Sequence, residues 1–369
     1  MQRKTMITAA LAAATLAGAG TMSTATAARS HAAVDRSTVT QNLVTPLSAA
    51  VRSNGTAYVA QNFMGQLIEK RPGKKPTVVF QAPGSDPGSN EVGAVSVRNG
   101  VVTFAVSTMG GGGLVKQATR SGDKWKIRTI ADVGAFEKTA NPDGDVVYGF
   151  RDLTEECAAQ IPEAFGPANY TGIVETHPYA TASDSSGIYL ADAAANAILE
   201  IEGDGTVSTL AVLPAVPTAI SAAFAEAAGL PECTVGETYY FESVPTDVEV
   251  GKDGMLYATS LPGGPDDGSA GANGAVYKVD PTTGNATLVA GGLVSAVGVA
   301  VAGNGDLYVS QLFAGQVSRI PAGTGDVLPF KSVALPSALE IVGDTLYATV
   351  NVLPGENEPP AGKLVRWAL

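Results

Sequence analysis

Four carboxylates, one imidazole and one amide are the side chains whose types and spacing could do chemistry. Each stands just before, or early in, an apolar strand-like segment; they are Asn90, Glu91, Glu175, His177, Glu242 and Asp247. Oxygen donors with one imidazole suit a hard divalent cation such as calcium, which tolerates an irregular ligand shell. Glu91, Glu175, His177 and Glu242 are the expected metal ligands, and we expect no cofactor other than such an ion. Alternatively, these side chains are polar only because water surrounds them.

Other catalytic arrangements are excluded by what the chain lacks. It has two histidines, His31 and His177, and no His-Glu-x-x-His motif, which excludes the common zinc protease site. No Gly-x-Ser-x-Gly segment provides the nucleophile of an α/β-hydrolase. Asp192, which follows an apolar segment, is expected to cap a turn rather than to bind a ligand.

The elements that must position these side chains come from an internal repeat. The sequence of Tyr58–Leu67 recurs with few changes at Tyr308–Val317. Six copies of the unit carry a Gly, Asn or Asp turn followed by an apolar strand, at residues 58–60, 101–104, 188–190, 255–257, 307–309 and 345–347. About four strands fit each copy, so the repeat predicts an all-β, six-bladed β-propeller. In that fold the turns into the innermost strands converge on one mouth of the central channel, which is where the six polar residues would meet.

The last repeat shows only three strands, within residues 338–342, 345–350 and 363–367. The fourth is available at the other end of the chain, from Thr38 to Val44. We therefore expect the mature N-terminal strand to close the ring and to hide both sheet edges, which would otherwise invite aggregation.

Two insertions flank the third repeat, near residues 140–176 and 214–244, and we expect them to form loops. The second includes a helix-like run from Ala219 to Ala228. Each insertion holds one of the two cysteines, Cys157 and Cys233. An even count in an oxidising compartment favours one disulfide, which would join the two insertions; two free buried thiols are the alternative.

The first residues predict export. Arg3 and Lys4 precede an apolar run from Ile7 to Ala19 and the small residues Ala25-Thr26-Ala27. A run of about 13 residues is shorter than the roughly 20 of a membrane span, so residues 1–27 are interpreted as a signal peptide, and residues 28–369 as a single secreted domain without a membrane span. Without Arg3 and Lys4 the chain has 21 basic and 35 acidic residues, a net charge of −14. Such a charge repels phosphate backbones, and no nucleic-acid partner is expected.

Several segments carry a resemblance to known families. Residues 188–199, Ile-Tyr-Leu-Ala-Asp-Ala-Ala-Ala-Asn-Ala-Ile-Leu, resemble the strand and loop of an NHL repeat. Phe136-Glu137, Asn141-Pro142-Asp143-Gly144, His177-Pro178-Tyr179 and Pro245-Thr246-Asp247-Val248 resemble the ScyD/ScyE family of exported bacterial proteins. The resemblance spans the mature chain and implies an NHL-like propeller outside the cytoplasm. It implies no reaction, and His177 stands where the family commonly has Asn.

Two functional classes follow from these observations. The first is a secreted binding or scaffold protein that takes an unknown small molecule or protein on its loop-rich face. The second is an enzyme, a metal-assisted lactonase or esterase that uses the carboxylates at the channel mouth to polarise a carbonyl group. Metal content would separate the two classes.

Overall fold

The computed structural model describes residues 37–84, 90–108, 110–265, 269–355 and 358–369. The predicted signal peptide, its cleavage site and His31 lie outside these residues. The fold is all-β: seven four-stranded antiparallel sheets with three short α-helices, α1 (Val133–Ala140), α2 (Glu155–Ala158) and α3 (Ala222–Ala228). Two 3₁₀ turns, η1 (Asn62–Met64) and η2 (Glu232–Thr234), complete the elements described.

Five of the sheets consist of four strands that follow one another in sequence. Sheet 1 contains β2 (Ala49–Val51), β3 (Ala57–Gln61), β4 (Gln66–Lys70) and β5 (Thr77–Gln81). Sheet 2 contains β6 (Asn90–Arg98), β7 (Val101–Thr108), β8 (Gly112–Ser121) and β9 (Lys124–Asp132). Sheet 3 contains β12 (Pro178–Ser183), β13 (Ile188–Asp192), β14 (Ala197–Ile201) and β15 (Val207–Val212). Sheet 4 contains β18 (Ser243–Val250), β19 (Leu256–Pro262), β20 (Gly274–Val279) and β21 (Ala286–Leu293). Sheet 5 contains β22 (Ala296–Val301), β23 (Leu307–Gln311), β24 (Gln316–Ile320) and β25 (Leu328–Ser332).

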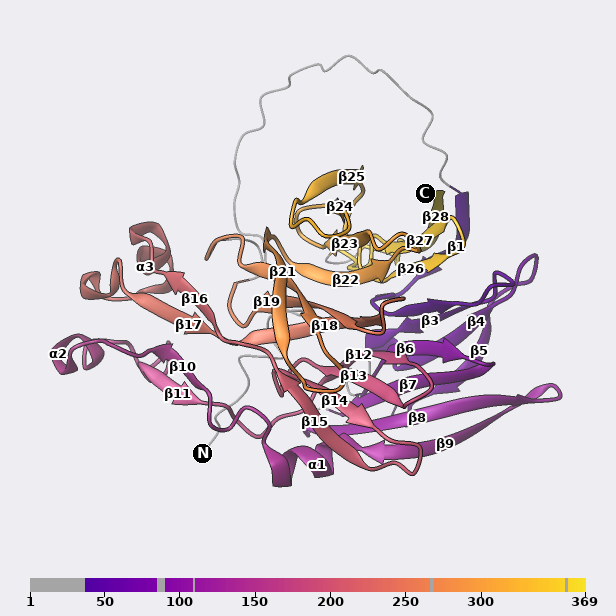
Figure 1. Cartoon of the computed structure of the whole chain (residues 1–369), viewed down its shortest axis with the longest axis horizontal. Coiled ribbons are helices and arrows are strands. Elements are labelled where there is room, and N and C mark those ends of the chain that lie inside the picture. Colours follow the sequence, from indigo (N-terminus) through magenta and orange to yellow (C-terminus); the bar gives the residue numbers. More distant parts are fainter. Residues whose placement is uncertain (1–36, 85–89, 109, 266–268, 356–357) are drawn as a thin grey trace, which may run out of the picture.

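Sheet 6 joins the two ends of the described chain. It contains β26 (Leu339–Val342), β27 (Thr345–Val350), β28 (Gly362–Ala368) and, beside β28, β1 (Ser37–Leu43). The strand expected at Thr38 to Val44 is thus present one residue earlier, and it pairs antiparallel with β28, with Ser37 opposite Arg366 (Figure 1). Leu43, only 3% exposed, anchors the strand in the core.

The strands form where the sequence supplies alternation and tight turns. Asn99 and Gly100 between β6 and β7 both have positive φ, at 50° and 81°. Asn-Gly takes up this geometry readily, and it matches the twist of the flanking strands. Each predicted repeat segment lies in the second strand of its sheet or in the turn that leads into it, as expected.

The first strands of sheets 1 to 6 lie side by side. β2 contacts β6, which contacts β12; the series continues through β18, β22 and β26, and β26 contacts β2 again. A buried hydrophobic cluster fills each space between neighbouring sheets, including that between sheets 6 and 1. This layered packing places the ends of all six first strands near one another.

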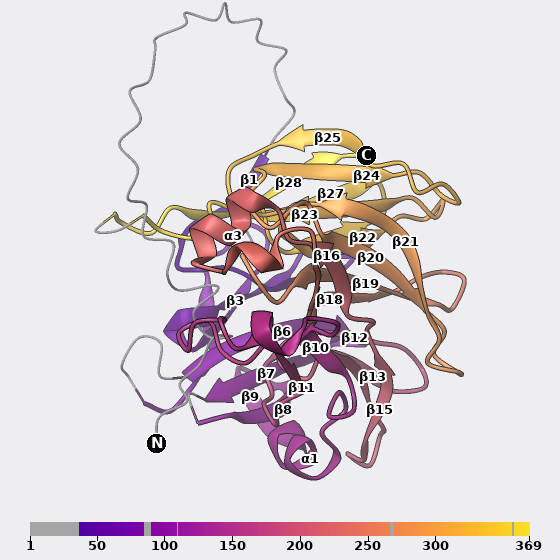
Figure 2. The same ribbon diagram turned by 90° about the vertical axis from the view of Figure 1, so that its left-hand side faces the viewer.

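The seventh sheet corrects the expectation that the insertions are loops. Its order is β11 (Asn169–Thr171), β10 (Val147–Phe150), β17 (Thr238–Phe241) and β16 (Val216–Ala219), so each insertion supplies two strands. The helix-like run is α3, but its expected first residue, Ala219, ends β16. This insertion sheet carries α2 and α3 at its outer end and projects from the rest of the molecule (Figures 1 and 2).

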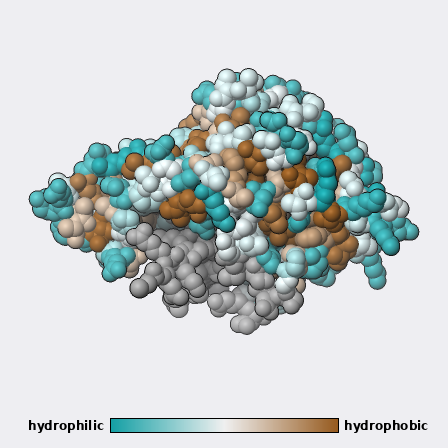
Figure 3. Space-filling model, turned by 90° about the horizontal axis from the view of Figure 1, so that it is seen from below, coloured by the Kyte–Doolittle hydropathy of each residue, from teal (hydrophilic) through white to brown (hydrophobic). Residues whose placement is uncertain are grey.

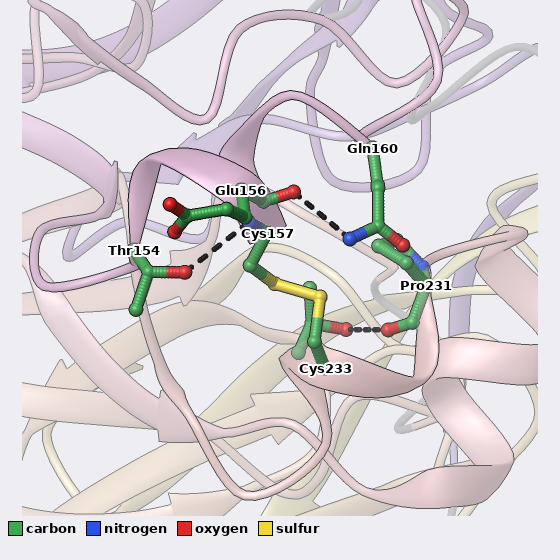
Figure 4. The surroundings of a disulfide bond; sticks show 7 residues. Thr154, Glu156, Cys157, Gln160, Pro231 and Cys233 are labelled. Atoms are coloured by element: carbon green, nitrogen blue, oxygen red, sulfur yellow. Dashed lines mark hydrogen bonds between the residues drawn. A yellow bond between two sulfur atoms is a disulfide. The ribbon is translucent and has the colours of Figure 1, made fainter.

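The insertion sheet has its own core and its own covalent link. Phe150, Tyr239 and Phe241 are buried together with residues of α3. Cys157 and Cys233 form a disulfide, with their Cα atoms 5.9 Å apart (Figure 4), which confirms the predicted pairing. A sheet built from two distant segments needs such a constraint more than a hairpin does, because the two halves are separated by all of sheet 3.

Candidate functional site

The predicted site residues lie around the beginnings of three first strands. Glu91 is the second residue of β6, His177 directly precedes β12, and Glu242 joins β17 to β18. These strands contact one another in the series β6, β12, β18. The segments that lead from the insertion sheet into β12 and β18 contain Glu175, His177 and Glu242, so these connections border the site.

Glu91 and His177 form the centre of this site. Glu91 Oε2 lies 3.2 Å from His177 Nε2, and each side chain is 20% exposed. The His177 ring also packs edge-on against Tyr179, with ring centres 5.9 Å apart. Burial opposes protonation of His177, but the hydrogen bond to Glu91 and the charges of Glu91, Asp192 and Glu175 outweigh it and raise its pKa. The contact with Glu91 therefore favours the protonated form of His177.

Asp192, fully buried at the end of β13, fixes the backbone next to this pair. It accepts hydrogen bonds from the His177 amide at 2.6 Å, from the Thr176 hydroxyl, and from the amides of Ala194 and Ala195 at 3.3 Å each. The bonds to Ala194 and Ala195 confirm the predicted turn cap. Those to Thr176 and His177 additionally hold the connection from the insertion sheet against sheet 3.

Glu242 and Glu175 bring further carboxylates to the same region. Glu242 is 4% exposed, and its burial is the main cause that raises its pKa to about 7. The charges of Asp143 and Glu175 also raise this pKa, whereas the hydrogen bond from Tyr170 lowers it. Burial also raises the pKa of Glu175, and the charge of His177 opposes this rise. Glu242 can therefore gain or lose a proton near neutral pH.

Two of the six predicted residues do not join the others. Asp247 lines a small central cavity of about 20 Å³, which none of the other five lines. There it accepts hydrogen bonds from the amides of Val248 and Val299, and burial raises its pKa to about 7. Its acidic neighbours are Glu249 and Glu340, both with raised pKa. Asn90 instead donates to the carbonyl of Pro83 and begins β6, so its role is to shape the chain.

Sequence reasoning missed the carboxylates that lie deepest. Glu137 and Asp143 are 2% and 1% exposed. The charge of Asp143 helps to raise the pKa of Glu242, and the Glu175 backbone acts on the pKa of Glu137. A signal was present: both stand in the segments Phe136-Glu137 and Asn141–Gly144 that carry the family resemblance. Those segments show no strand pattern and precede the repeat unit, which is why spacing alone did not connect them with Glu242.

Within the described residues, no three His, Cys, Asp or Glu side chains are arranged to hold a metal ion. The Nε2 atom of His177 is already engaged by Glu91 Oε2. No helix in the described part of the chain has the length and apolar character of a membrane span.

Comparison with solved structures identifies the fold as that of the β-propeller proteins. A glucose dehydrogenase-like putative oxidoreductase from Thermus thermophilus matches with a TM-score of 0.54 at 14% identity, covering 90% of this chain and 99% of its own. A Bacteroides thetaiotaomicron protein of unknown function matches with a TM-score of 0.54 at 13% identity, covering 89% and 75%. Virginiamycin B lyase from Staphylococcus aureus matches with a TM-score of 0.50 at 15% identity, covering 91% and 99%.

Such identities establish the fold alone. No protein-family model matches the chain, and no curated protein matches it by sequence.

Proposed function

We propose that sheets 1 to 6 are the blades of a six-bladed, NHL-like propeller whose ring is closed by β1. The support is the series of contacts among the first strands, which returns from β26 to β2, and the buried cluster between sheets 6 and 1. In this arrangement the insertion sheet is an accessory to the third blade and stands at one mouth of the channel.

We further propose that the protein is an exported binding or scaffold protein of the ScyD/ScyE type. The observation that carries this proposal is the partly exposed Glu91–His177 pair, held rigidly by Asp192 and bordered by the connection from the insertion sheet. In that connection Ile173 and Val174 are 49% and 53% exposed. Export is supported by the disulfide, which persists in oxidising compartments.

This combination favours a ligand that has an apolar part and a polar or cationic group. The apolar part would cover Ile173 and Val174, and the polar group would meet Glu91 or Glu175. Exposed apolar residues beside fixed polar groups are typical of binding sites. On the part of the surface that is coloured in Figure 3, hydrophobic residues form patches among hydrophilic ones.

The test is a ligand screen with matched variants. Thermal shift of the mature chain against a defined panel of amines, amino acids, lactones and aryl esters would find candidates. Calorimetry would then compare the Glu91→Gln, His177→Gln double variant with the control Glu155→Gln, an exposed residue of α2. We expect affinity to fall at least tenfold in the double variant only. Equal affinity in all three proteins would refute the assignment.

A metal-assisted lactonase or esterase using Glu91, Glu175, His177 and Glu242 is the second candidate. The observation that favours an enzyme is Glu242, whose pKa of about 7 suits a general acid or base. The test is turnover of lactones and aryl esters by chelator-treated protein before and after calcium is added. Turnover that depends on calcium and is lost in a Glu175→Gln, Glu242→Gln variant would select this class; no turnover in either state would exclude it.

A further inference from the structure

A second cluster of oxygen atoms lies where three parts of the chain meet. Glu137 comes from α1, Asn141 and Asp143 from the turn that follows α1, and Asn196 from the turn between β13 and β14. Glu137, Asp143 and Asn196 are 2%, 1% and 1% exposed. The cluster thus connects α1 and the base of the insertion sheet to sheet 3.

Five buried oxygen atoms in this cluster accept no hydrogen bond of ordinary geometry, although the Glu175 amide lies close enough to Glu137 to oppose the rise in its pKa. The five atoms are Glu137 Oε1 and Oε2, Asn141 Oδ1, Asp143 Oδ1 and Asn196 Oδ1. All five are acceptors, and burying an acceptor without a partner costs about 1–3 kcal/mol. Folded proteins leave few such atoms, so five together indicate that something binds between them.

The orientation of the two amides is fixed by their other atoms. Asn141 Nδ2 donates to the Gly172 carbonyl at 3.2 Å, and Asn196 Nδ2 donates to Asp143 Oδ2 at 2.7 Å. Turning either amide over would break that bond and place two oxygens together. The unpartnered atoms are therefore oxygens, as a cation requires.

Within the described residues, no basic side chain forms an ion pair with the two carboxyl groups of the cluster. None of the five ion pairs formed by the described residues includes Glu137 or Asp143. The other titratable groups that interact electrostatically with the cluster are also acidic: Asp192 acts on Glu137, and Asp143 acts on Glu242. Asp192 has four donors of its own, and Glu242 has the Tyr170 hydroxyl, whereas Glu137 has no well-formed hydrogen bond.

We propose that this cluster binds one hard divalent cation of the calcium class. Two carboxylates and two amides supply five oxygens, and calcium takes six to eight, so water would complete the shell. The set contains only two acidic side chains, which distinguishes it from a cluster of three or more His, Cys, Asp or Glu ligands. It shares no residue with Glu91, Glu175, His177 and Glu242, and the proposal does not depend on the proposed function.

The ion would have a structural role, because it would link the insertion sheet to sheet 3. Gly172, just after β11, packs so closely on Asp143 that an added Cβ would overlap the carboxylate. Asp143 also accepts a hydrogen bond from Tyr148 of β10 at 3.0 Å. A cation bound to Asp143 and Asn196 would therefore fix the insertion sheet, and with it the connection that carries Glu175 and His177, against sheet 3.

The experiment is calcium titration into chelator-treated mature protein, followed by calorimetry and by thermal unfolding. We expect one calcium ion per chain, a higher melting temperature with calcium, and at least tenfold weaker binding in Glu137→Gln and in Asp143→Asn. The variant Glu91→Gln should bind calcium as the wild type does, since Glu91 belongs to the other site.

Terbium provides a second measurement that does not depend on stability. Tyr148 should sensitise the luminescence of Tb³⁺ bound beside Asp143, and calcium should displace the signal. Loss of the signal in Glu137→Gln protein that retains its native circular dichroism spectrum would support the site. No saturable calcium binding at millimolar concentration would overturn the proposal and leave protons as the compensating charge. Binding that is lost in Glu91→Gln but kept in Glu137→Gln would overturn it in favour of the site at His177.

Discussion

In the absence of divalent ions, Glu137 should make the stability of the protein fall as pH rises. Burial is the largest cause that raises its pKa from 4.5 to about 8, and the charges of Asp192 and Asp143 add to it; the Glu175 amide opposes the shift. Between these two values the folded protein keeps a proton that the unfolded chain has released. The free energy of unfolding therefore decreases with pH over this range.

The size of the effect follows from the two pKa values. At about 1.4 kcal/mol per pH unit, a rise from 4.5 to about 8 corresponds to about 5 kcal/mol. This is an upper bound, because Asp143 and Asp192 titrate together with Glu137. The isosteric variant Glu137→Gln cannot ionise, and it brings an amide donor to a cluster whose unpartnered atoms are all acceptors.

The assay is urea unfolding in chelator at pH 5.5, 7 and 8.5, followed by the fluorescence of Trp125 and Trp367. We expect the wild type to lose several kcal/mol between pH 5.5 and 8.5 relative to Glu137→Gln, and the variant to be the more stable protein at pH 8.5. An exposed control, Glu155→Gln, should follow the wild type. Parallel pH profiles for wild type and Glu137→Gln would show that the carboxylate carries no burial cost and would refute the reasoning.

Three further predictions concern the fold. A chain that begins at residue 44 lacks β1, exposes the edge of β28 and loses the buried Leu43 side chain, so it should melt several degrees below a chain that begins at residue 37; equal melting curves would contradict ring closure. Replacing Cys157 and Cys233 by Ser should preserve the far-UV spectrum but speed cleavage of the insertions by a Glu-specific protease, and an unchanged cleavage rate would show that the bridge constrains nothing. Gly172→Ala should lower the free energy of unfolding by at least about 2 kcal/mol because its Cβ overlaps a buried carboxylate, whereas Gly203→Ala, where the Cβ meets open space, should change it little in the same urea assay.

The two proposed sites differ in what the sequence revealed of them. Glu91 and His177 could be predicted to lie together because each stands at the beginning of a first strand of a repeated unit, and repeats place equivalent positions alike. The same rule also placed Asp247 in this group. Asp247 lies within β18, and its side chain turns into the central cavity rather than toward the end of the strand.

The insertions show why part of the fold was beyond prediction. Both were predicted to be loops, the second with a helix-like run, because strands such as β10 (Val147–Phe150) and β17 (Thr238–Phe241) are short and have Pro and Gly nearby. Gly149 pairs with Tyr240, although all four strands of sheet 3 lie between them in the sequence. No local sequence pattern encodes such a distant partner. The cysteines were the one sequence signal that the two insertions meet.

The sequence by itself determined the strands of sheets 1 to 6, the strand at the N-terminal end that completes sheet 6, and the disulfide. The strands depend on turn residues, on alternation and on a repeat, which act between near neighbours in the chain or recur at a period. The disulfide follows from the presence of two cysteines, one in each insertion. Only the tertiary structure decided the insertion sheet and the cluster of Glu137, Asp143 and Asn196. Their partners come together because the packing of the sheets brings residues 137, 172 and 196 to one place, and the burial that raises the pKa of Glu137 exists only after that packing has formed.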